Sequence, residues 1–279
     1  MIDLHLHTTA SDGLLSPSEL VARAQQVGLT TISVTDHDTV ASLDDAWRHA
    51  GAAGISFVPG IEITSVHNGR DVHILGYFID EGNEPLARFL ERQRSQRVER
   101  LHEIAGRLAQ LGMSIDVERL LSDPALAEGS AIGRPAVARA LVESGYVSSI
   151  DDAFRELLGT GRPAFVPRRG FAPVAVVDII HRAGGLASLA HPGLTREPEL
   201  LETLAREGLD ALEAYHTDHT QAMRDDALAT AGRLQLAVTG GSDYHGNDAR
   251  RPIGGVTLPQ ADFDAFVARR RHAGGQAER

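Results

Sequence analysis

The amino-acid sequence predicts an α/β fold in which a parallel sheet is covered by helices. Short apolar runs typical of buried strands alternate with longer segments of helical periodicity from the N-terminus onward. Polar residues repeatedly stand beside these apolar runs, as expected where a buried strand ends at a site. The chain has 279 residues, which fits one large α/β barrel or two ordinary domains.

The first part of the chain contains four predicted strands and two predicted helices. Ser16 and Pro17 mark the start of the first helix, and Gly28 marks its end. In chain order we expect a strand at 2–6, a helix at 17–28, a strand at 30–36, a helix at 40–52, and strands at 55–63 and 71–79.

The last third of the chain returns to the same alternation. We expect a helix at 174–185, a strand at 186–191, a helix at 198–208, a strand at 209–215, a helix at 220–235 and a strand at 236–243. Apolar strands that alternate with helices in this way are typical of a barrel or a doubly wound sheet.

The region between these two parts is predicted to be a mostly helical insertion. It opens with a long charged helix at 86–112, and shorter helical stretches follow at 134–144 and 149–158. The predicted division is a barrel formed by residues 1–83 and 168–279, which carries the active site. The insertion of residues 84–167 is expected to cap that site.

Composition and charge exclude several classes of protein. The formal net charge of -11 argues against broad attraction to nucleic acid, so no stable binding of duplex DNA is expected. The absence of cysteine excludes disulfides, thiolate metal ligands and a cysteine nucleophile. No apolar run approaches the roughly 18 residues of a membrane-spanning helix, and the first motif begins at once, without room for a signal peptide. We therefore expect a cytoplasmic protein without a membrane partner.

Histidine and carboxylate side chains form a set of potential metal ligands in six short blocks. The blocks are IDLHLHTTASDG, VTDHDT, PGIEIT, DVHILG, LAHPG and GSDYHG. Nitrogen and oxygen donors of this kind suit divalent transition metals, and the set is too large for one ion. The sequence therefore predicts a multinuclear site built from His5, His7, Asp12, His37, Glu62, His73, His191, Asp243 and His245.

Spacing and strand positions bring these residues to one place. His5 and His7 are two apart on a strand and so face the same side, and Asp243 and His245 repeat that spacing after a pair of glycines. In a barrel, active sites form at the C-terminal ends of the strands. Ligands from five separate strands are therefore expected to meet at one mouth.

Each block taken alone has an ordinary structural explanation. The HxH pair could be structural, TDHDT could be a turn capped by Asp36 or Asp38, and Glu62 could be a surface carboxylate. His73 alone would more often be a core histidine, and His191 could belong to a plain turn. The joint occurrence favours the metal site. The remaining histidines lack this context and are expected at the surface or in packing: His49, His67, His102, His181 and His272.

Taken in order, the blocks closely resemble those of the polymerase-and-histidinol-phosphatase (PHP) superfamily of metal-dependent phosphoesterases. The HxH followed by SDG, the TDHDT, the GIE, the VHI, the AHPG and the SDYH all match, over essentially the whole chain. The short N-terminus, the SDG in place of a histidine block, and the helical insertion are most similar to the stand-alone nucleotide phosphoesterases. These include 3′,5′-nucleotide bisphosphate phosphatases and 5′-to-3′ oligoribonucleotide exonucleases.

The resemblance implies a distorted (β/α)7 barrel with three divalent metal ions. It assigns His5, His7, Glu62 and Asp243 to one ion, then Glu62, His73 and His191 to a second, and Asp12, His37 and His245 to the third. Glu62 would thus bridge two ions. Manganese is the expected metal, and iron or zinc also suits these ligands.

Such a site implies hydrolysis of a phosphate ester by a metal-bound hydroxide. Adjacent divalent ions lower the pKa of a bound water and stabilise charge on the transferred phosphoryl group. No protein nucleophile is then needed, and none is assigned. His216 and His219 follow a strand; His216 is a candidate for proton transfer, against the alternative of a plain polar strand end.

Four arginines of the insertion are candidates for binding a second phosphate, because guanidinium groups pair well with phosphate oxygens. Arg94 and Arg97 lie three apart on the long helix, Arg134 opens a helix whose amides also favour an anion, and Arg162 lies in a turn. Each could equally be a solvated surface residue. Related sequences often carry histidine in place of Ala136 and lysine in place of Arg162, so the substitution at Ala136 leaves the exact substrate open.

These observations predict an enzyme that hydrolyses phosphate from a nucleotide 3′,5′-bisphosphate or from the 5′ end of short RNA. One alternative is a phosphomonoesterase of the histidinol-phosphate or sugar-phosphate type, which needs a single phosphate pocket. Another is a non-catalytic PHP module, although such a module would typically have lost ligands. Deamination or amide hydrolysis would require a carbamylated lysine, and the chain contains no lysine.

Overall fold

The computed structural model describes residues 1–122, 133–195, 198–247 and 249–274, and it has the predicted α/β architecture. Seven strands form one sheet in which each strand lies beside its neighbours in the chain. A bridge between Leu6 and Tyr244 joins the two ends of the sheet, which nearly closes into a distorted barrel. The strands are β1 (Ile2–Leu6), β2 (Thr31–Val34), β3 (Ser56–His67), β4 (Arg70–Tyr77), β5 (Leu186–Leu189), β6 (Ala211–His216) and β7 (Ala237–Gly241).

One strand departs from the expected parallel sheet. β4 is antiparallel to both β3 and β5, whereas the other neighbouring strands are parallel. The chain reverses at Asn68 and Gly69, which have positive φ angles of 49° and 74°. A two-residue Asn-Gly turn matches the twist of an antiparallel hairpin. The sheet is therefore mixed, and the prediction of a wholly parallel sheet is wrong at this hairpin.

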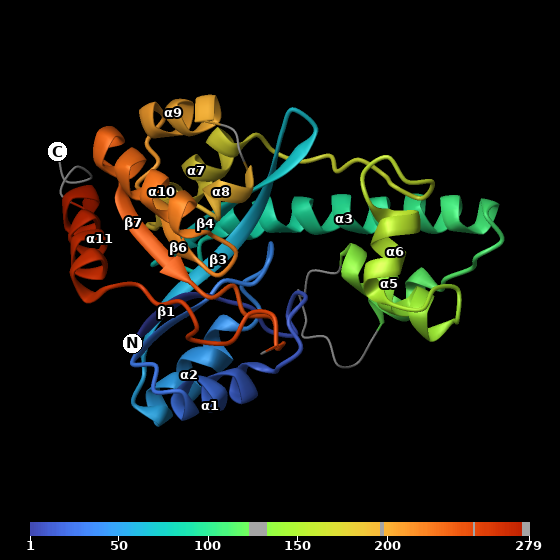
Figure 1. Cartoon of the computed structure of the whole chain (residues 1–279), viewed down its shortest axis with the longest axis horizontal. Coiled ribbons are helices and arrows are strands. Elements are labelled where there is room, and N and C mark those ends of the chain that lie inside the picture. The colour runs from blue at the N-terminus through green and yellow to red at the C-terminus, as the bar shows by residue number, and fades with distance from the viewer. Residues whose placement is uncertain (123–132, 196–197, 248, 275–279) are drawn as a thin grey trace.

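Helices cover the outside of the barrel, with α1 and α2 on one side and α7 and α9 on the opposite side (Figure 1). The predicted start of α1 is confirmed, because the amide of Ser16 donates to the Glu19 carboxylate at 2.9 Å and the Ser16 hydroxyl caps the helix in return. These outer helices are α1 (Pro17–Gln26), α2 (Leu43–Ala53), α7 (Pro173–Arg182), α8 (Pro192–Thr195), α9 (Pro198–Arg206) and α10 (Gln221–Leu234).

A further helix, α11 (Gln260–Gly274), was not predicted from the sequence. It lies beside β7 (Figure 1). Its Phe266 is fully buried and meets the Tyr77 ring edge-on, with ring centroids 5.4 Å apart. The helix therefore closes the apolar side of the barrel where the first and last strands meet.

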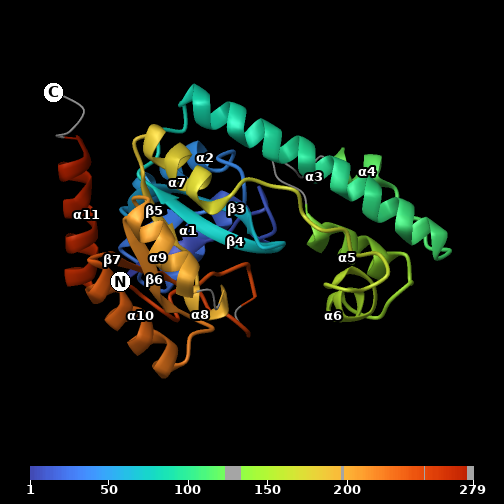
Figure 2. The same ribbon diagram turned by 90° about the horizontal axis from the view of Figure 1, so that it is seen from above.

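The helical insertion is confirmed, and one long helix joins it to the barrel. The first half of α3 (Glu84–Gln110) packs into the barrel core through Phe89 and Leu90, whereas its second half packs through Ile104 and Leu108 into a separate apolar cluster. α3 extends from the barrel toward α5 and α6, and these two helices stand apart from the barrel (Figure 2). The remaining elements are α4 (Val117–Leu121), α5 (Arg134–Glu143), α6 (Ile150–Ala153) and a π-helical turn η1 (Phe154–Leu158).

The interior of the barrel is partly polar. His5 Nδ1 on β1 lies 2.9 Å from Glu213 Oε1 on β6, and Ser188 Oγ on β5 lies 2.7 Å from Thr239 Oγ1 on β7. All four side chains are buried. Buried polar groups need hydrogen-bond partners, and each of these four side chains finds one on another strand. His5 is also one of the predicted ligands, so the polar interior adjoins the predicted site. None of the described helices is long and apolar enough to span a membrane.

Candidate metal centre

The predicted ligand side chains from β1, β3, β4 and the loops after β2, β5 and β7 come together in space. In the described residues, donor atoms within 4.8 Å of one another form four overlapping groups of potential ligands. One of them, His5, Glu213 and His216, includes two residues outside the predicted set. The other three consist of predicted ligands alone. These groups are His5, His7, Glu62 and Asp243; His7, Asp12, His37 and His245; and His37, Glu62 and His73. His191 joins them through its Nε2, which lies 3.2 Å from Glu62 Oε1. The whole predicted set therefore meets at one site.

The grouping differs in detail from the one implied by the family resemblance. The first group contains the expected four residues. His37, however, lies between two groups: its Nδ1 is 3.2 Å from Glu62 Oε2, and its Nε2 is 3.8 Å from Asp12 Oδ2. His7 likewise belongs to two groups. Both histidines therefore lie where neighbouring ion positions would meet.

Glu62 is the central residue of the cluster. Its Oε1 lies 2.8 Å from His73 Nδ1, and its Oε2 lies 3.2 Å from His5 Nε2. Glu62 lies within β3 and not at a strand end, which corrects the expected position. The reason is that β3 continues past the barrel mouth to His67, where it pairs with β4. Its side chain is 1% exposed, so a surface role is excluded.

Hydrogen bonds fix the orientation of two histidine rings. Nδ1 of His5 lies 2.9 Å from the Glu213 carboxylate, and Nδ1 of His245 lies 2.9 Å from the backbone oxygen of Asp243. Because these partners can only accept, each Nδ1 carries the proton and donates it. Each Nε2 is then left with a lone pair directed at the carboxylates, as in a metal-ligating histidine.

Glu213 was missed in the sequence analysis. It is a fully buried carboxylate among apolar neighbours, Leu212 and Ala214, in the middle of β6. Its second oxygen accepts a hydrogen bond from the backbone amide of His191 at 2.8 Å. A charged residue in an apolar strand is the signal that could have identified it.

Asp243 presents its two oxygens to different partners. Oδ1 lies 3.1 Å from His7 Nε2 and 3.3 Å from His5 Nε2. Oδ2 lies 3.2 Å from His216 Nε2 and also pairs with Arg251. Because donors occupy Oδ2, Oδ1 is the oxygen that faces the ligand cluster.

His216 and His219 both have their ring nitrogens in hydrogen bonds. His216 Nδ1 accepts from the backbone amide of Asp218 at 3.1 Å, so in the neutral ring the proton lies on Nε2, beside Asp243. His219 Nδ1 donates to the Ala214 carbonyl at 2.9 Å, and its Nε2 accepts from the amide of Gly193 at 3.3 Å. His219 therefore holds the turn that follows His191.

The loop that carries Asp12 is held by a buried carboxylate, Asp36. Asp36 Oδ1 accepts from the Thr8 amide at 2.8 Å and from the Ser11 hydroxyl at 2.7 Å, while Oδ2 accepts from the Thr8 hydroxyl at 2.7 Å. The Ser42 hydroxyl also donates to Oδ2. These bonds fold residues 8–13 back over the end of β1, which brings Asp12 Oδ1 within 3.3 Å of His245 Nε2.

Three residues of the site region have left-handed backbone conformations. The φ angles are 54° at Asp38, 31° at His191 and 54° at Asp243. Non-glycine residues in this region are uncommon and carry a conformational cost that the surrounding structure must offset. Gly241, two residues before Asp243, could not carry a side chain, because a Cβ would lie 2.4 Å from the His5 amide nitrogen. The backbone at the end of β7 thus approaches that of β1 closely beside the site.

Unpartnered nitrogen atoms test whether these residues suit a metal. Both ring nitrogens of His7, Nδ1 of His37 and Nδ1 of His191 are buried without a hydrogen-bond partner. Buried polar groups normally have partners, so these atoms point to a missing electron-pair acceptor. Together with three carboxylates, the imidazole nitrogens form a donor set suited to divalent transition metals. The residues therefore fit metal ions.

The pKa values of the cluster lead to the same conclusion. Burial alone would raise the pKa of Glu62, but the surrounding histidines hold it well below its ordinary value. Burial alone would lower the pKa of His7, but the carboxylates of Asp243 and Glu62 raise it to about 10. At His37 burial dominates and lowers the pKa to about 3. The carboxylates thus remain ionised and attract positive charge, which divalent cations supply while the histidines stay neutral.

An open cavity of about 250 Å³ lies above the cluster. Two of its lining residues, Leu194 and Arg251, are not predicted ligands. The other lining residues are His37, Glu62, His73, His191, Asp243 and His245. Six of the potential ligands therefore line a cavity that a small molecule can enter.

The structure brings two of the four predicted arginines close together. Arg97 Nε donates to Asp38 Oδ2 at 2.8 Å, and its guanidinium lies beside Gly133, immediately before Arg134. Arg134 lies 3.6 Å from Asp71. Arg94 instead pairs with Glu91 on its own helix. Arg162 is exposed in its turn.

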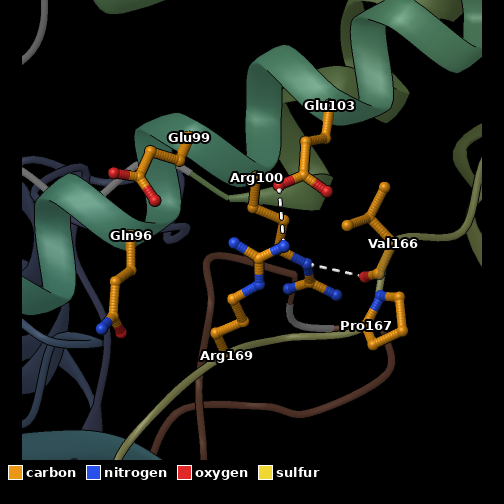
Figure 3. A pocket seen from close by; sticks show the side chains of 7 residues that line it. All are labelled: Gln96, Glu99, Arg100, Glu103, Val166, Pro167 and Arg169. Carbon is orange, nitrogen blue, oxygen red and sulfur yellow. Dashed lines mark hydrogen bonds and ion pairs between the residues drawn. The ribbon is translucent and has the colours of Figure 1, made fainter.

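Two further arginines complete this arginine cluster and were missed in the sequence analysis. Arg168 lies 3.5 Å from Asp38 and 3.3 Å from Asp71, so it joins the partners of Arg97 and Arg134. Arg100 is buried and donates from Nε to the Val166 carbonyl at 2.9 Å (Figure 3). Burial and the nearby positive charges of Arg134 and Arg168 lower the pKa of Arg100 to about 9. Several positive charges therefore lie close together here. We use the name arginine cluster for Arg97, Arg100, Arg134 and Arg168.

The exposed Arg169 lies beside Arg100 but has a different partner. Its guanidinium is 3.6 Å from Glu103 on α3 (Figure 3). Ala136, where related sequences often carry histidine, lies in the first turn of α5, two residues after Arg134. The arginine cluster therefore occupies the seam between α3, α5 and the segment that returns to the barrel.

The fold and the site define a metal-dependent hydrolase. A family model described as the PHP domain matches residues 3–120. The chain is also 36% identical over 250 residues to the 5′-3′ exoribonuclease Rnm of Escherichia coli, across 87% of this chain and 84% of that protein. The chain therefore belongs to the PHP family of metal-dependent phosphoesterases, and it is a phosphoric ester hydrolase.

Other relatives act on different phosphate esters. The chain is 35% identical to the phosphoribosyl 1,2-cyclic phosphate 1,2-diphosphodiesterase of Eggerthella lenta, across 92% of this chain and 98% of that protein. It is 31% identical to the 3′,5′-nucleoside bisphosphate phosphatase of Chromobacterium violaceum, across 88% and 87%. A solved structure described as a metal-dependent phosphoesterase from Bifidobacterium adolescentis has a TM-score of 0.87 at 31% identity and covers 96% of both chains. The predicted fold, family and class of reaction are thus confirmed.

Proposed function

We propose that the protein removes phosphate from nucleotides that carry a second phosphate, either as a nucleoside 3′,5′-bisphosphate or at the 5′ end of short RNA. One observation carries this proposal. The carboxylates that hold the arginine cluster come from the same segments as two proposed ligands: Asp38 follows His37, and Asp71 lies two residues before His73 on β4. A site for one phosphate thus adjoins a site for another.

The proposed metal centre holds three divalent ions, with manganese as the expected metal. Each imidazole nitrogen or carboxylate of the cluster would bind one of these ions, and Glu62 would be shared between two. When bound, the ions supply an activated water and stabilise negative charge on the phosphoryl group. Three such ions would change the local charge from that of three carboxylates, about -3, to about +3, which attracts a phosphate despite the net charge of -11.

The proposed role of the arginine cluster is to bind the remote phosphate and so position the ester at the metal centre. Arg97 and Arg134 flank the start of α5, where backbone amides also favour an anion. The predicted insertion, residues 84–167, would thereby cap the site and select the substrate. Arg94 pairs with Glu91 on its own helix and Arg162 is exposed in its turn, so we assign them weaker contributions from the rim.

His216 is proposed to hold Asp243 in place and not to accept a proton. Its Nδ1 is occupied by the Asp218 amide, and its Nε2 proton is directed at Asp243. The proton released by the attacking water would then leave through solvent in the open cavity. Glu213 is proposed to orient His5 in the same way.

The relatives support this substrate class because two of them are named for activities on nucleotides or RNA. A phosphomonoesterase with one phosphate pocket would leave the arginine cluster without a role. The acidic net charge disfavours duplex DNA as a partner. A cytoplasmic location agrees with these substrates and remains part of the proposal.

A panel of phosphate esters tests the proposed function. Protein reconstituted with manganese would be assayed with adenosine 3′,5′-bisphosphate, a 5′-phosphorylated oligoribonucleotide, a ribose cyclic phosphate and histidinol phosphate. We expect the first two to have the highest kcat/KM. Equal or faster turnover of histidinol phosphate would contradict the proposal. Elemental analysis that finds fewer than three ions per chain at saturation would contradict the trinuclear centre.

A further inference from the structure

We propose that Arg251 is a further catalytic residue, which donates hydrogen bonds to the phosphoryl oxygens of the substrate at the metal centre. This inference rests on the proposed function and adds a protein group to it. Arg251 lies in the loop after β7 and lines the same cavity as His37, Glu62 and Asp243. Among the residues that line that cavity, it is the only one with a permanent positive charge.

Two carboxylates fix the guanidinium of Arg251 in place. Nη1 pairs with Oδ2 of Asp243, and Nη2 pairs with Oδ2 of Asp218 in the loop after β6. Asp218 is itself held, because its amide donates to His216. A planar group bound at two corners cannot rotate freely, so its remaining donors are oriented before a substrate arrives.

The guanidinium has donors that the protein does not use. An arginine carries five N–H groups, and the pairs with Asp243 and Asp218 engage only Nη1 and Nη2. Nε is buried without a hydrogen-bond partner in the described structure. Because Nε is shielded from solvent, a phosphoryl oxygen in the adjoining cavity would receive charge-assisted hydrogen bonds from the remaining N–H groups of Nη1 and Nη2.

The hydrolysis step explains why such a donor would accelerate the reaction. The oxygen of water forms a bond to phosphorus, the ester P–O bond breaks, and the leaving oxygen takes up a proton that derives from the water. The products are an alcohol and inorganic phosphate, so one water is consumed. Negative charge spreads over the phosphoryl oxygens and the leaving oxygen during this exchange. A fixed guanidinium beside them stabilises that charge without reorganisation.

A merely structural role for Arg251 makes a different prediction. Its Nη1 also lies 3.5 Å from the backbone oxygen of Asp243, so the arginine could act only by holding this proposed ligand. In that case its loss would release metal. If Arg251 contacts phosphate directly, its loss would weaken phosphate binding while the metal content stays the same, because His216 still holds Asp243 Oδ2.

The test compares Arg251→Gln and Arg251→Lys with Arg250→Gln, a matched control at the exposed neighbouring position. Metal content would be measured by elemental analysis, and affinity for inorganic phosphate by calorimetry, on manganese-reconstituted full-length protein. For Arg251→Gln we expect the wild-type metal content, phosphate binding weaker by about 10-fold, and kcat lower by about 100-fold. Arg251→Lys should recover part of the phosphate affinity through its charge. Arg250→Gln should match the wild type.

Two results would overturn the inference. One is unchanged phosphate affinity in Arg251→Gln. The other is a loss of metal that, once corrected by excess manganese, restores phosphate affinity to the wild-type value. If the wild-type protein itself fails to bind metal or to hydrolyse any ester of the panel, the proposed function and this inference both fail. If the wild-type protein binds metal and hydrolyses esters but the variants do not behave as expected, only the proposed role of Arg251 is contradicted.

Discussion

Glu213 and His5 form a buried pair across the barrel, with Glu213 Oε1 2.9 Å from Nδ1 of His5. The carboxylate can only accept a hydrogen bond, so the proton of the neutral imidazole is held on Nδ1. The lone pair of Nε2 is thereby directed at Glu62 and Asp243. The pair sets the tautomer that a metal ligand requires, from a residue that is itself outside the proposed set of ligands.

Glu213→Gln should weaken metal binding about 10- to 100-fold. The amide of glutamine has nearly the shape of the carboxylate, but its NH₂ group donates. If it donates to His5 Nδ1, the proton moves to Nε2, and the lone pair that would bind metal is lost. Titration of metal-free protein with manganese measures the effect. Glu202→Gln, at a 53% exposed side chain on α9, is the matched control. Equal affinity in both variants would show that Glu213 does not set the tautomer.

Asp36→Ala should destabilise the fold by about 2 kcal/mol or more. The change leaves the buried donors of Thr8, Ser11 and Ser42 without their acceptor, and each unsatisfied buried donor costs about 1 to 3 kcal/mol. Because the same bonds hold the loop that carries Asp12, the variant should also bind one ion fewer at moderate metal concentration. Urea unfolding and elemental analysis check the two effects. Asp45→Ala, at a 54% exposed carboxylate on α2, should change neither.

Arg168→Gln should raise the KM for a nucleoside bisphosphate about 10-fold and leave the KM for a simple monoester nearly unchanged. The loss of one charged hydrogen bond to phosphate costs about 1.5 to 3 kcal/mol. Arg97 and Arg134 still pair with Asp38 and Asp71, so the fold should persist. Arg88→Gln, at a 66% exposed position on α3, is the control. A parallel rise of KM for both substrates would instead indicate a general distortion of the site.

The cluster of proposed metal ligands could be predicted from sequence because each residue stands in a local pattern. His5 and His7 share a face of one strand, and Asp243 follows a glycine pair at the end of another, so strand spacing alone brings them to the mouth. The hairpin at Asn68 and Gly69 also had a local signal, but it was outweighed by the expectation of parallel strands.

The residues that support the ligands could not be predicted in the same way. Glu213, Arg168 and Arg251 belong to none of the six sequence blocks, and their roles arise only from long-range packing. Glu213 and His5, for example, are 208 residues apart. Such contacts form only when the sheet closes, and local sequence patterns do not show which distant residues this closure brings together. The effect of Ala136 could not be predicted either, because its methyl side chain forms no hydrogen bond or ion pair from which a role could be inferred.

The interaction of His181, at the end of α7, with Asp210 makes a pH-dependent contribution to the stability of the folded protein. His181 Nε2 lies 2.7 Å from Asp210 Oδ2, and this hydrogen bond, with the charge of Asp210 and Asp178, raises the pKa of His181 above its ordinary value of 6.5. Protonated His181 therefore stabilises the folded state. The contribution is fully present below pH 6.5, the value of the unfolded chain, and is lost as the pH rises through the higher folded pKa.

His181→Gln should therefore destabilise the protein more at pH 6 than at pH 9. Glutamine keeps a hydrogen bond to Asp210 but cannot carry the charge. Because the His181 side chain is 37% exposed, solvent screens the pair, and we expect a difference below about 1 kcal/mol. Urea unfolding of both proteins at a series of pH values measures it. In an Asp210→Asn background the difference should change less with pH, since the charge of Asp210 is absent and only that of Asp178 remains. A difference that grows as the pH rises would contradict the direction of the shift.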